Sequence, residues 1–326
     1  MENYVIRFRF KSPVHFGDSN QDPDITSSDF LLQNDSLFSA LMNEAVRIYG
    51  QDGANEFYNK NKNISFSSMM PFRDDVFYIP KPVFFTESEK TNETNNYGKL
   101  LKKLKYIPVS YLSEYLEKSR NSDLPVEELV KKQNSFGIMS TEVKVNISRD
   151  SSKDNMPYYV GTFTFEKNCG TYIVMKCESS ELDYIKILLN SLSVTGIGGK
   201  RSSGYGKFEY EIIEVKTSNN PDIKAYEHLL SCKAERYMTL SICLPTDDCD
   251  DSFCTDAYYT LVRRSGFIDS VTYNSSLMKK KDVYVFGVGS TFTHVFEGQI
   301  KNVGSDFGKH PVYKHLKPIF VGVKSI

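Results

Sequence analysis

The residues best suited to bind an anion are concentrated in one short segment, residues 196–208. Its sequence, GIGGKRSSGYGKF, holds five glycines and three cations within thirteen residues. Glycine has no Cβ, so its backbone adopts positive φ and its N–H groups can approach an anion closely. Lys200 and Arg201 supply charge, and Ser202 and Ser203 supply hydroxyl donors. The segment therefore predicts a phosphate-binding loop, with a flexible turn carrying solvated cations as the alternative.

The loop does not match the common nucleotide-binding motifs. A P-loop needs four residues between its first glycine and a Gly-Lys-Ser/Thr, whereas here Gly204 is followed by Tyr205. A dinucleotide fingerprint needs a small residue where Arg201 stands. Both motifs also lead from a strand into a helix, and this loop is predicted to lead from a helix into a strand. The sequence therefore predicts no nucleotide cofactor.

Composition limits the class of protein. The chain has 326 residues, 40% of them hydrophobic and 25% charged, which favours two globular domains. A formal net charge of −1 argues against nonspecific coating of nucleic acid, so any contact with nucleic acid must be local. No apolar run suits a membrane span and the N-terminus lacks a signal-peptide pattern, so a cytoplasmic location is expected. The six cysteines form no Cys-x-x-Cys pair, which indicates reduced thiols and no metal site.

Hydrophobic periodicity predicts an ordered series of elements in the first half. A strand at 4–11 alternates apolar residues with Arg7, Arg9 and Lys11, which gives it a cationic face. The elements expected after it are a helix at 37–49 capped by residues 34–36, a hairpin at 64–79, strands at 141–148, 158–166 and 171–176, a helix at 182–192 and a strand at 207–216. The order β, α, ββ, α, β is typical of a ferredoxin-like domain, here residues 1–216.

Two regions interrupt this series. A polar stretch at 87–96 and the basic stretch that follows indicate an insertion, which we expect to be mobile or ordered by a partner. Residues 217–235 are predicted to link to a second, less regular ferredoxin-like domain at 236–326. Its expected elements are a strand at 237–244, a helix at 253–264 and strands at 282–288, 291–296 and 319–323. The predicted class is α+β, with two RRM-like βαββαβ domains.

Several short motifs resemble those of the RAMP superfamily of CRISPR-associated RNA-binding proteins, and in particular the family of fourth subunits of type III-A Csm effector complexes. The motifs are KSPVHFG at 11–17, NDSLFSAL at 34–41, MPF at 70–72 with YIPKP at 78–82, GGKRSSGYG at 198–206 and HPVY at 310–313. They follow the family's order along most of the chain.

The resemblance implies a noncatalytic subunit of a heteromeric complex. Such a subunit holds the 5′ tag of the CRISPR RNA and contacts the large polymerase-like subunit and an adjacent backbone RAMP subunit. The hairpin of the first domain, with its insertion at about 83–176, would be a thumb along the guide. The RNA-binding residues implied are His15, Gly198, Gly199, Lys200, Arg201, Ser202, Ser203, Gly204, Tyr205, Arg7, Arg9, Lys144, Asn146 and Arg149.

Three other functions remain open from the residues. A metal-independent endoribonuclease that processes precursor RNA would use His15 as general acid or base. A polymerase-like palm would use Asp74 and Asp75 to hold metal, but Arg73 beside them favours a polar turn. A generic ferredoxin-like interaction module is the third. We expect RNA binding without catalysis, and neither cofactor nor metal.

Overall fold

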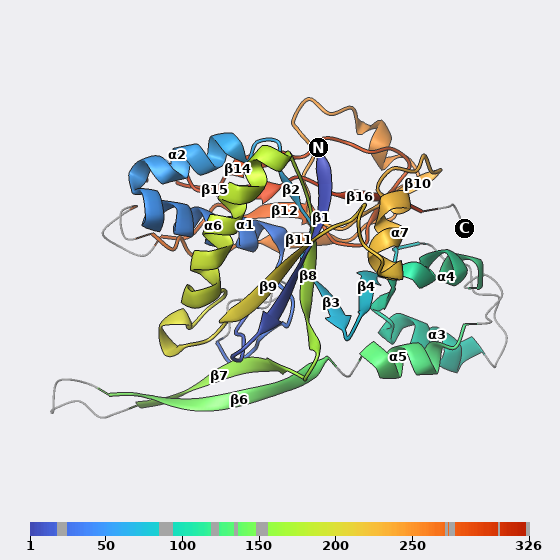
Figure 1. The fold of residues 1–326 in the computed structure, drawn as a ribbon, viewed down its shortest axis with the longest axis horizontal. Coiled ribbons are helices and arrows are strands. Elements are labelled where there is room, and N and C mark those ends of the chain that lie inside the picture. The colour runs from blue at the N-terminus through green and yellow to red at the C-terminus, as the bar shows by residue number, and fades with distance from the viewer. Residues whose placement is uncertain are drawn as a thin grey trace.

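The computed structural model describes residues 1–17, 25–84, 94–118, 124–133, 136–147, 156–270, 273, 278–305 and 307–323. A large antiparallel sheet forms the centre of the molecule, with helices on both sides of it and a long hairpin projecting from one end (Figure 1). No helix in these ranges combines the length and the apolar character needed to cross a bilayer.

The central sheet belongs to the N-terminal half. Its strands are β1 Glu2–Phe10, β2 Ser65–Phe66, β3 Met70–Arg73, β4 Val76–Pro80, β5 Tyr106–Pro108, β8 Cys169–Cys177 and β9 Phe208–Glu214. The strand order is β5-β4-β3-β8-β1-β9, and β2 also pairs with β8. Strand β1 pairs with β8 and β9, so that Phe8 lies opposite Thr171 on one side and Tyr210 on the other. The predicted strands at both ends of this half and the predicted β3–β4 hairpin are confirmed.

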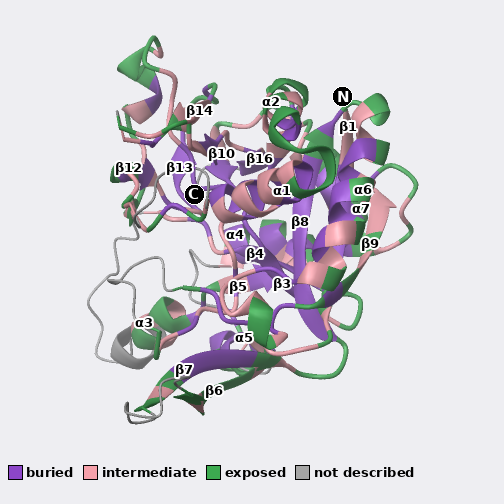
Figure 2. Ribbon diagram, turned by 90° about the vertical axis from the view of Figure 1, so that its left-hand side faces the viewer, coloured by how far each residue is buried: buried purple, intermediate pink, exposed green. Residues whose placement is uncertain are grey.

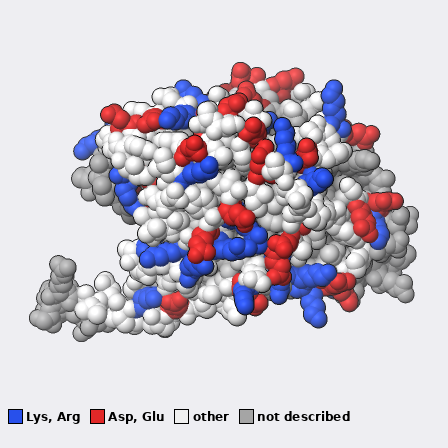
Figure 3. Space-filling model, viewed as in Figure 1, with Lys and Arg blue, Asp and Glu red and all other residues white. Residues whose placement is uncertain are grey.

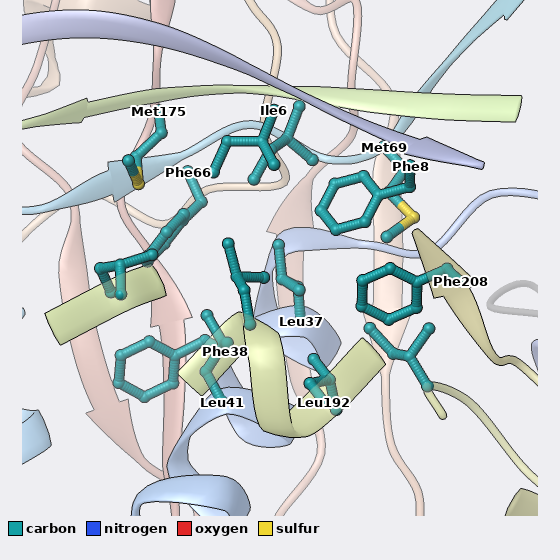
Figure 4. Close-up of a cluster of buried hydrophobic side chains, with 14 of the residues drawn as sticks. Ile6, Phe8, Leu37, Phe38, Leu41, Phe66, Met69, Met175, Leu192 and Phe208 are labelled. Carbon is teal, nitrogen blue, oxygen red and sulfur yellow. The ribbon is translucent and has the colours of Figure 1, made fainter. Parts of the chain in front are cut away.

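Helices α1 (Asn34–Tyr49) and α6 (Ser179–Thr195) cover one face of this sheet, and α2 (Gln51–Lys60) packs against α1. Their apolar side chains meet those of β1 and β8 in a continuous core (Figure 4). Phe8, Phe38 and Leu192 are fully buried there. Burial of apolar area at about 25 cal/mol per Å² holds the helices against the sheet, and it fixes the point where α6 delivers the chain to the glycine-rich loop.

The predicted capping of α1 is wrong. The helix begins after Gln33, and no side chain caps it. The Asn34 amide instead donates to the carbonyls of Ile242 (3.1 Å) and His315 (2.9 Å). A side chain suited to cap a helix therefore joins the two halves of the chain.

Asp35 makes a second connection between the halves. Its buried carboxylate accepts hydrogen bonds from Arg264 Nη2 (2.7 Å) and Lys314 Nζ (2.8 Å). Burial alone would raise the pKa of Asp35, but the two cations outweigh it and hold this pKa well below its usual range. The carboxylate is therefore ionised wherever the protein is folded near neutral pH.

The other face of the sheet is covered by residues that we expected to lie outside the core. Helices α3 (Thr94–Lys103), α4 (Leu112–Lys118) and α5 (Val126–Gln133) follow β4 in the chain. Leu112 and Leu129 are buried in one cluster with Phe72 and Tyr172 of the sheet. The expectation that the basic stretch is mobile or ordered by a partner is thus wrong for residues 94–105, because their apolar side chains pack against this second core. Residues 85–93, with most of the polar stretch, lie outside the described residues.

The segment predicted as a linker, 217–235, contains helix α7 (Pro221–Leu229), which packs against the rest of the protein. Asn220 caps the helix, and Asp222 accepts hydrogen bonds from the backbone N–H groups of Phe77 (2.9 Å) and Ser110 (2.8 Å). Tyr226 is fully buried in the second cluster, which also contains Met238 of the C-terminal half. The two halves therefore share a core.

The projecting hairpin consists of β6 (Gly137–Asn146) and β7 (Met156–Phe165), which pair along their whole lengths. It confirms the hairpin predicted from the alternation in 141–166, and strand 171–176 is part of β8. Figure 2 shows β6 exposed along most of its length, whereas part of β7 is buried. Val143 lies opposite Tyr159, and both are more than half exposed, so one face of the hairpin presents apolar side chains to solvent.

The described part of the C-terminal half consists of a three-stranded sheet, β13-β10-β16, and two strand pairs, β11-β12 and β14-β15, rather than a second βαββαβ unit. Its strands are β10 Arg236–Thr239, β11 Leu261–Arg264, β12 Val283–Phe286, β13 Thr291–Phe292, β14 Gln299–Asn302, β15 Tyr313–Leu316 and β16 Phe320–Val323. The helix predicted at 253–264 is wrong: a 3-10 turn at Asp251–Cys254 is followed by β11. Arg264 of β11 reaches the buried Asp35, so the side chains of Arg264 and Val262 point towards the protein interior. Strand β12 pairs with β11.

Candidate nucleic-acid interface

The glycine-rich loop, residues 196–206, begins where α6 ends and runs into β9. Gly196, Gly198, Gly204 and Gly206 all have positive φ, between 72° and 95°. Lys200 also lies in the left-handed region, and Arg201–Ser203 form a 3-10 turn after it. The glycines therefore do supply the backbone freedom that the sequence predicted.

The loop packs against the protein's own residues 13–16. The N–H of Gly199 donates to His15 O (2.8 Å), and that of Gly206 donates to Pro13 O (2.9 Å). A Cβ on Gly198 would lie 2.7 Å from Phe16 Cδ1. The glycine content predicts that N–H groups of this loop approach an anion. For Gly199, Gly204 and Gly206 this is wrong, because their hydrogens are donated to carbonyl groups within the protein.

His15 is buried and forms part of the same packing. Its Nδ1 lies 2.7 Å from the carbonyl oxygen of Gly161 on β7. A carbonyl only accepts, so Nδ1 carries the proton. The backbone of Val14 also pairs with Phe163. His15 thus joins the loop to the base of the hairpin, and no carboxylate, hydroxyl or cation contacts its ring among the described residues.

Side chains of the loop and the hairpin form a second connection. Tyr205 is buried and donates a short hydrogen bond to Glu142, whose carboxylate also contacts Lys144 Nζ at 2.8 Å. The hydrogen bonds from Lys144 and then Tyr205 lower the pKa of Glu142. Lys200 Nζ lies 4.7 Å from the centre of the Tyr158 ring. Tyr205 was predicted as an RNA-binding residue, and its aromatic ring is not exposed for stacking.

Arg201 is the only loop cation with an ion pair among the described residues. Its Nη2 lies 3.1 Å from Oδ2 of Asp269, which is largely exposed. Ser202, Ser203 and Lys207 are exposed. The exposed part of the loop is therefore the shoulder from Lys200 to Ser203, where one cation is already neutralised by a carboxylate from the C-terminal half.

The cationic face predicted for β1 is mostly absent. Arg7 is buried: its Nη2 donates to Asp74 O (2.5 Å), and its guanidinium lies 4.3 Å from the centre of the Phe72 ring. Its guanidinium is therefore engaged within the protein, and its role as an RNA-binding residue stays a prediction. Arg9 is exposed, and Lys11 pairs with Glu209 at 2.8 Å. Only the end of β1 next to the loop presents cations to solvent.

The remaining predicted residues are on the hairpin. Lys144 and Asn146 lie on β6, Lys144 next to the loop and Asn146 exposed further out. Arg149 lies outside the described residues. The structure thus brings together His15, the loop and Lys144, and it separates Arg7 from them.

The charges of this region are mixed in sign. Figure 3 shows Lys and Arg interspersed with Asp and Glu over the body of the molecule, whereas the projecting hairpin is mostly uncharged. Tyr158, Glu142 and Asp269 contact the predicted residues and were missed by the sequence analysis. Hairpin register could have suggested the first two, since alternation puts them on the face of Lys144. Nothing in the sequence near Asp269 indicated that it meets Arg201.

The paired aspartates at 74–75 occupy a turn. Asp74 has a φ of 53° and connects β3 to β4. Asn168 Nδ2 donates to its carboxylate at 2.9 Å. Within the described ranges no group of three or more His, Cys, Asp or Glu side chains is placed to hold a metal ion. The polar turn favoured by Arg73 agrees with this geometry.

Comparisons with known proteins identify the family. Residues 7–209 match the family model of the RAMP superfamily, and residues 232–323 match that of the CRISPR Csm4 C-terminal domain. The chain is 32% identical over 323 residues to the CRISPR system Cms protein Csm4 of Mycobacterium tuberculosis (strain H37Rv), covering 99% of this chain and 98% of that protein. The chain belongs to the Csm4 family of the RAMP superfamily. It is also 29% identical to the Csm4 protein of Streptococcus thermophilus, over 97% of each chain.

Solved structures agree with this assignment at the level of the fold. The crystal structure of a Csm3-Csm4 subcomplex in the type III-A CRISPR-Cas interference complex contains a similar chain, with a TM-score of 0.64, 20% identity and 99% of both chains covered. A chain of a Csm1-Csm4 cassette in complex with cA4 gives a TM-score of 0.58 at 18% identity, over 98% of both chains. The resemblance seen in the sequence motifs is confirmed.

Proposed function

We propose that this chain is a structural subunit of a cytoplasmic type III-A Csm interference complex, that it holds the 5′ tag of the guide RNA, and that it docks the large polymerase-like subunit. Membership of the Csm4 family supports this proposal. The similar chains in the Csm3-Csm4 and Csm1-Csm4 structures support two neighbours, a backbone RAMP subunit and the large subunit.

The observation that carries the RNA-binding proposal is the rigid presentation of the Lys200–Ser203 shoulder. The loop is held from below by residues 13–16 and from the side by the hairpin, through Lys200–Tyr158 and Tyr205–Glu142. A phosphate contacted there would meet groups already fixed in position, which reduces the entropy lost on binding. Contacts of this kind set the register of an RNA backbone.

The hairpin supplies surface of a different kind. Its outward face carries Met139, Val143, Val145 and Tyr159, each more than half exposed. Apolar and aromatic side chains of this kind stack on unpaired bases and separate neighbouring ones. We assign the hairpin the role of a thumb along the guide, with Asn146 on its polar face.

We also propose that the N-terminal half is a ferredoxin-like domain. Its strands and helices follow one another as β1, α1, β3, β8, α6, β9, and the four strands lie in the sheet in the order β3-β8-β1-β9. This is the arrangement of a βαββαβ unit. The loop then lies between the second helix and the last strand of that unit.

We further propose that the subunit does not cleave RNA. A general acid or base must reach the reacting group, and the buried imidazole of His15 is already bonded to Gly161. An endoribonuclease that processes precursor CRISPR RNA is the alternative function.

The test is an incubation of the purified chain, alone and in the assembled complex, with tagged guide RNA and with precursor RNA. The proposal predicts retention of guide RNA and no discrete cleavage products. Cleavage that disappears in His15→Ala would establish the nuclease instead.

A further inference from the structure

A cleft of about 440 Å³ lies beside residues 29–33, and no residue of the glycine-rich loop lines it. It is bounded by β3 and β4 of the sheet, by the end of α3 and by Thr260 and Val288 of the C-terminal half. Its volume is within the range of about 300–1,000 Å³ that holds small organic ligands in proteins. None of the residues predicted to bind RNA lines it.

One wall of the cleft is apolar and aromatic. Leu31, Met69 and Met70 are buried there, and the Tyr106 ring packs edge-on against Phe30. Methionine side chains adapt to the shape of a flat ring and interact favourably with it. This wall suits a planar aromatic group such as a nucleobase.

Two hydrogen-bond donors in the cleft have no partner among the described residues. Oε1 of Gln33 lies 2.7 Å from Ser68 Oγ, whose hydroxyl also lies 2.9 Å from Oδ1 of Asn34, and the NH₂ group of Gln33 makes no hydrogen bond there. The hydroxyl of Tyr106 also makes no hydrogen bond there. Burial, and then the charge of Asp29, raise the pKa of Tyr106, so its hydroxyl remains a donor at neutral pH. Both side chains are only partly buried and line the cleft, so both donors are accessible to a ligand there.

The remaining wall carries an excess of positive charge. Lys81, Lys102 and Lys105 line the cleft, and Asp29 is its single acidic residue. Lys81 Nζ donates to Leu101 O (2.6 Å), which uses one of its three hydrogens. Burial lowers the pKa of Lys81, so an anion beside it would offset the cost of keeping this amine charged. Asp29 already accepts from the N–H groups of Phe30 (2.7 Å) and Leu31 (3.3 Å).

We propose that this cleft binds one nucleoside monophosphate unit, with the base against Met69 and Tyr106 and the phosphate on the lysines. The unit comes either from a single-stranded RNA or from a free mononucleotide. The proposal does not depend on the glycine-rich loop, and substitutions of Lys200 and Arg201 test that loop separately.

The chain contains no tryptophan, so Val83→Trp at the rim of the cleft gives a fluorescent reporter with no background. The full chain carrying this reporter is titrated with AMP, adenosine and inorganic phosphate. We expect saturable quenching by AMP and weaker binding of the other two probes, since each lacks half of the contacts. Lys81→Met should weaken AMP binding about tenfold or more, because it removes a charged donor. Tyr106→Phe tests the hydroxyl alone with the ring in place.

Lys103→Met is the matched control, since Lys103 is an exposed neighbour that does not line the cleft, and it should change AMP binding less than twofold. Absence of quenching, equal binding of phosphate and AMP, or an equal effect of Lys103→Met would each overturn the proposal. Adding unlabelled guide RNA then identifies the source. Displacement of AMP by RNA assigns the cleft to a nucleotide of the RNA, and failure of RNA to displace AMP assigns it to a free mononucleotide.

Discussion

Individual glycines allow the backbone of the loop to approach other backbone atoms of the protein closely. Gly204 and Gly206 both have positive φ, at 88° and 72°. A Cβ on Gly206 would lie 2.0 Å from Ile197 O, whereas one on Gly204 would meet no atom within 4 Å. The two positions therefore separate backbone strain from steric exclusion.

Alanine at these two positions should have very different costs. Gly204→Ala should lower the free energy of unfolding by about 1–2 kcal/mol, the cost of a left-handed alanine. Gly206→Ala should lower it by about 4 kcal/mol or disrupt the loop, because the obstructing atom is backbone. Urea denaturation of both variants provides the measurement. Equal losses would show that the approach of the loop to Ile197 is not needed.

Asp269 should restrain the affinity for RNA. Its carboxylate pairs with Arg201 on the surface, and an RNA phosphate must displace it. Asp269→Asn should raise the affinity for guide RNA about two- to fivefold, in line with the strength of exposed ion pairs. Asp183→Asn, which removes an exposed partner of Lys186 on α6, is the control and should have no effect. Unchanged or weaker binding in Asp269→Asn would contradict the role of Arg201.

At the residue scale, the residue types predicted the glycine-rich loop and its position between a helix and a strand. They did not indicate which cations are exposed to solvent and able to contact RNA. Arg7 and Arg9 alternate on one strand and looked equivalent. Phe72 of β3 and Phe77 of β4 cover the guanidinium of Arg7, and Arg9 stays exposed. That difference depends on strand pairing over long sequence separations, which local periodicity does not contain.

At the level of elements, the start of α1 is the joint between the two halves. Asn34 and Asp35 bind the backbone or side chains of four C-terminal residues, Ile242, Arg264, Lys314 and His315. A buried carboxylate with two cations is costly to break, because each remaining charge is left unpaired.

Asp35→Asn should therefore lower the free energy of unfolding by about 3–5 kcal/mol at pH 7. The folded-state pKa of Asp35 is depressed, so its contribution is complete above the unfolded pKa of about 3.9 and is lost as pH falls below it. The difference between wild type and variant should thus stay constant from pH 7 to about pH 4 and shrink as the pH falls further. Thermal or urea unfolding across this range measures it. A difference that stays constant with pH would show that Asp35 does not stabilise the joint through its charge.

At the level of the whole molecule, the two halves of the chain share a hydrophobic core and are not two separate domains joined by a linker. Helix α7 and strands β10 and β16 share a buried cluster with the central sheet. The strands and helices of the first half were predictable because their periodicity is clear. The second half was not, since its strands are only two to four residues long and obtain their partners from distant segments.

The same reason explains the error in the helix at 253–264. Phe253 joins an aromatic cluster with Phe286, Phe292 and Phe296, and Leu261–Arg264 pair with β12. Tertiary contacts therefore override the local helical pattern. The packing of helices α3–α5 was missed for a related reason. Their apolar residues are buried against a face of the central sheet, and the sequence alone did not indicate that this face lies next to them.

The central claim is that the Lys200–Arg201 shoulder contacts RNA phosphates, and the most direct measurement is the salt dependence of guide-RNA retention in the assembled complex. Lys200→Ala with Arg201→Ala is compared with Lys60→Ala with Lys118→Ala, which removes two exposed lysines from α2 and α4. The account predicts weaker retention and a salt slope reduced by about 1.4 for the loop variant, since each lost contact with single-stranded RNA removes about 0.7. The control should match the wild type. A loop variant with wild-type retention and an unchanged slope would contradict the account.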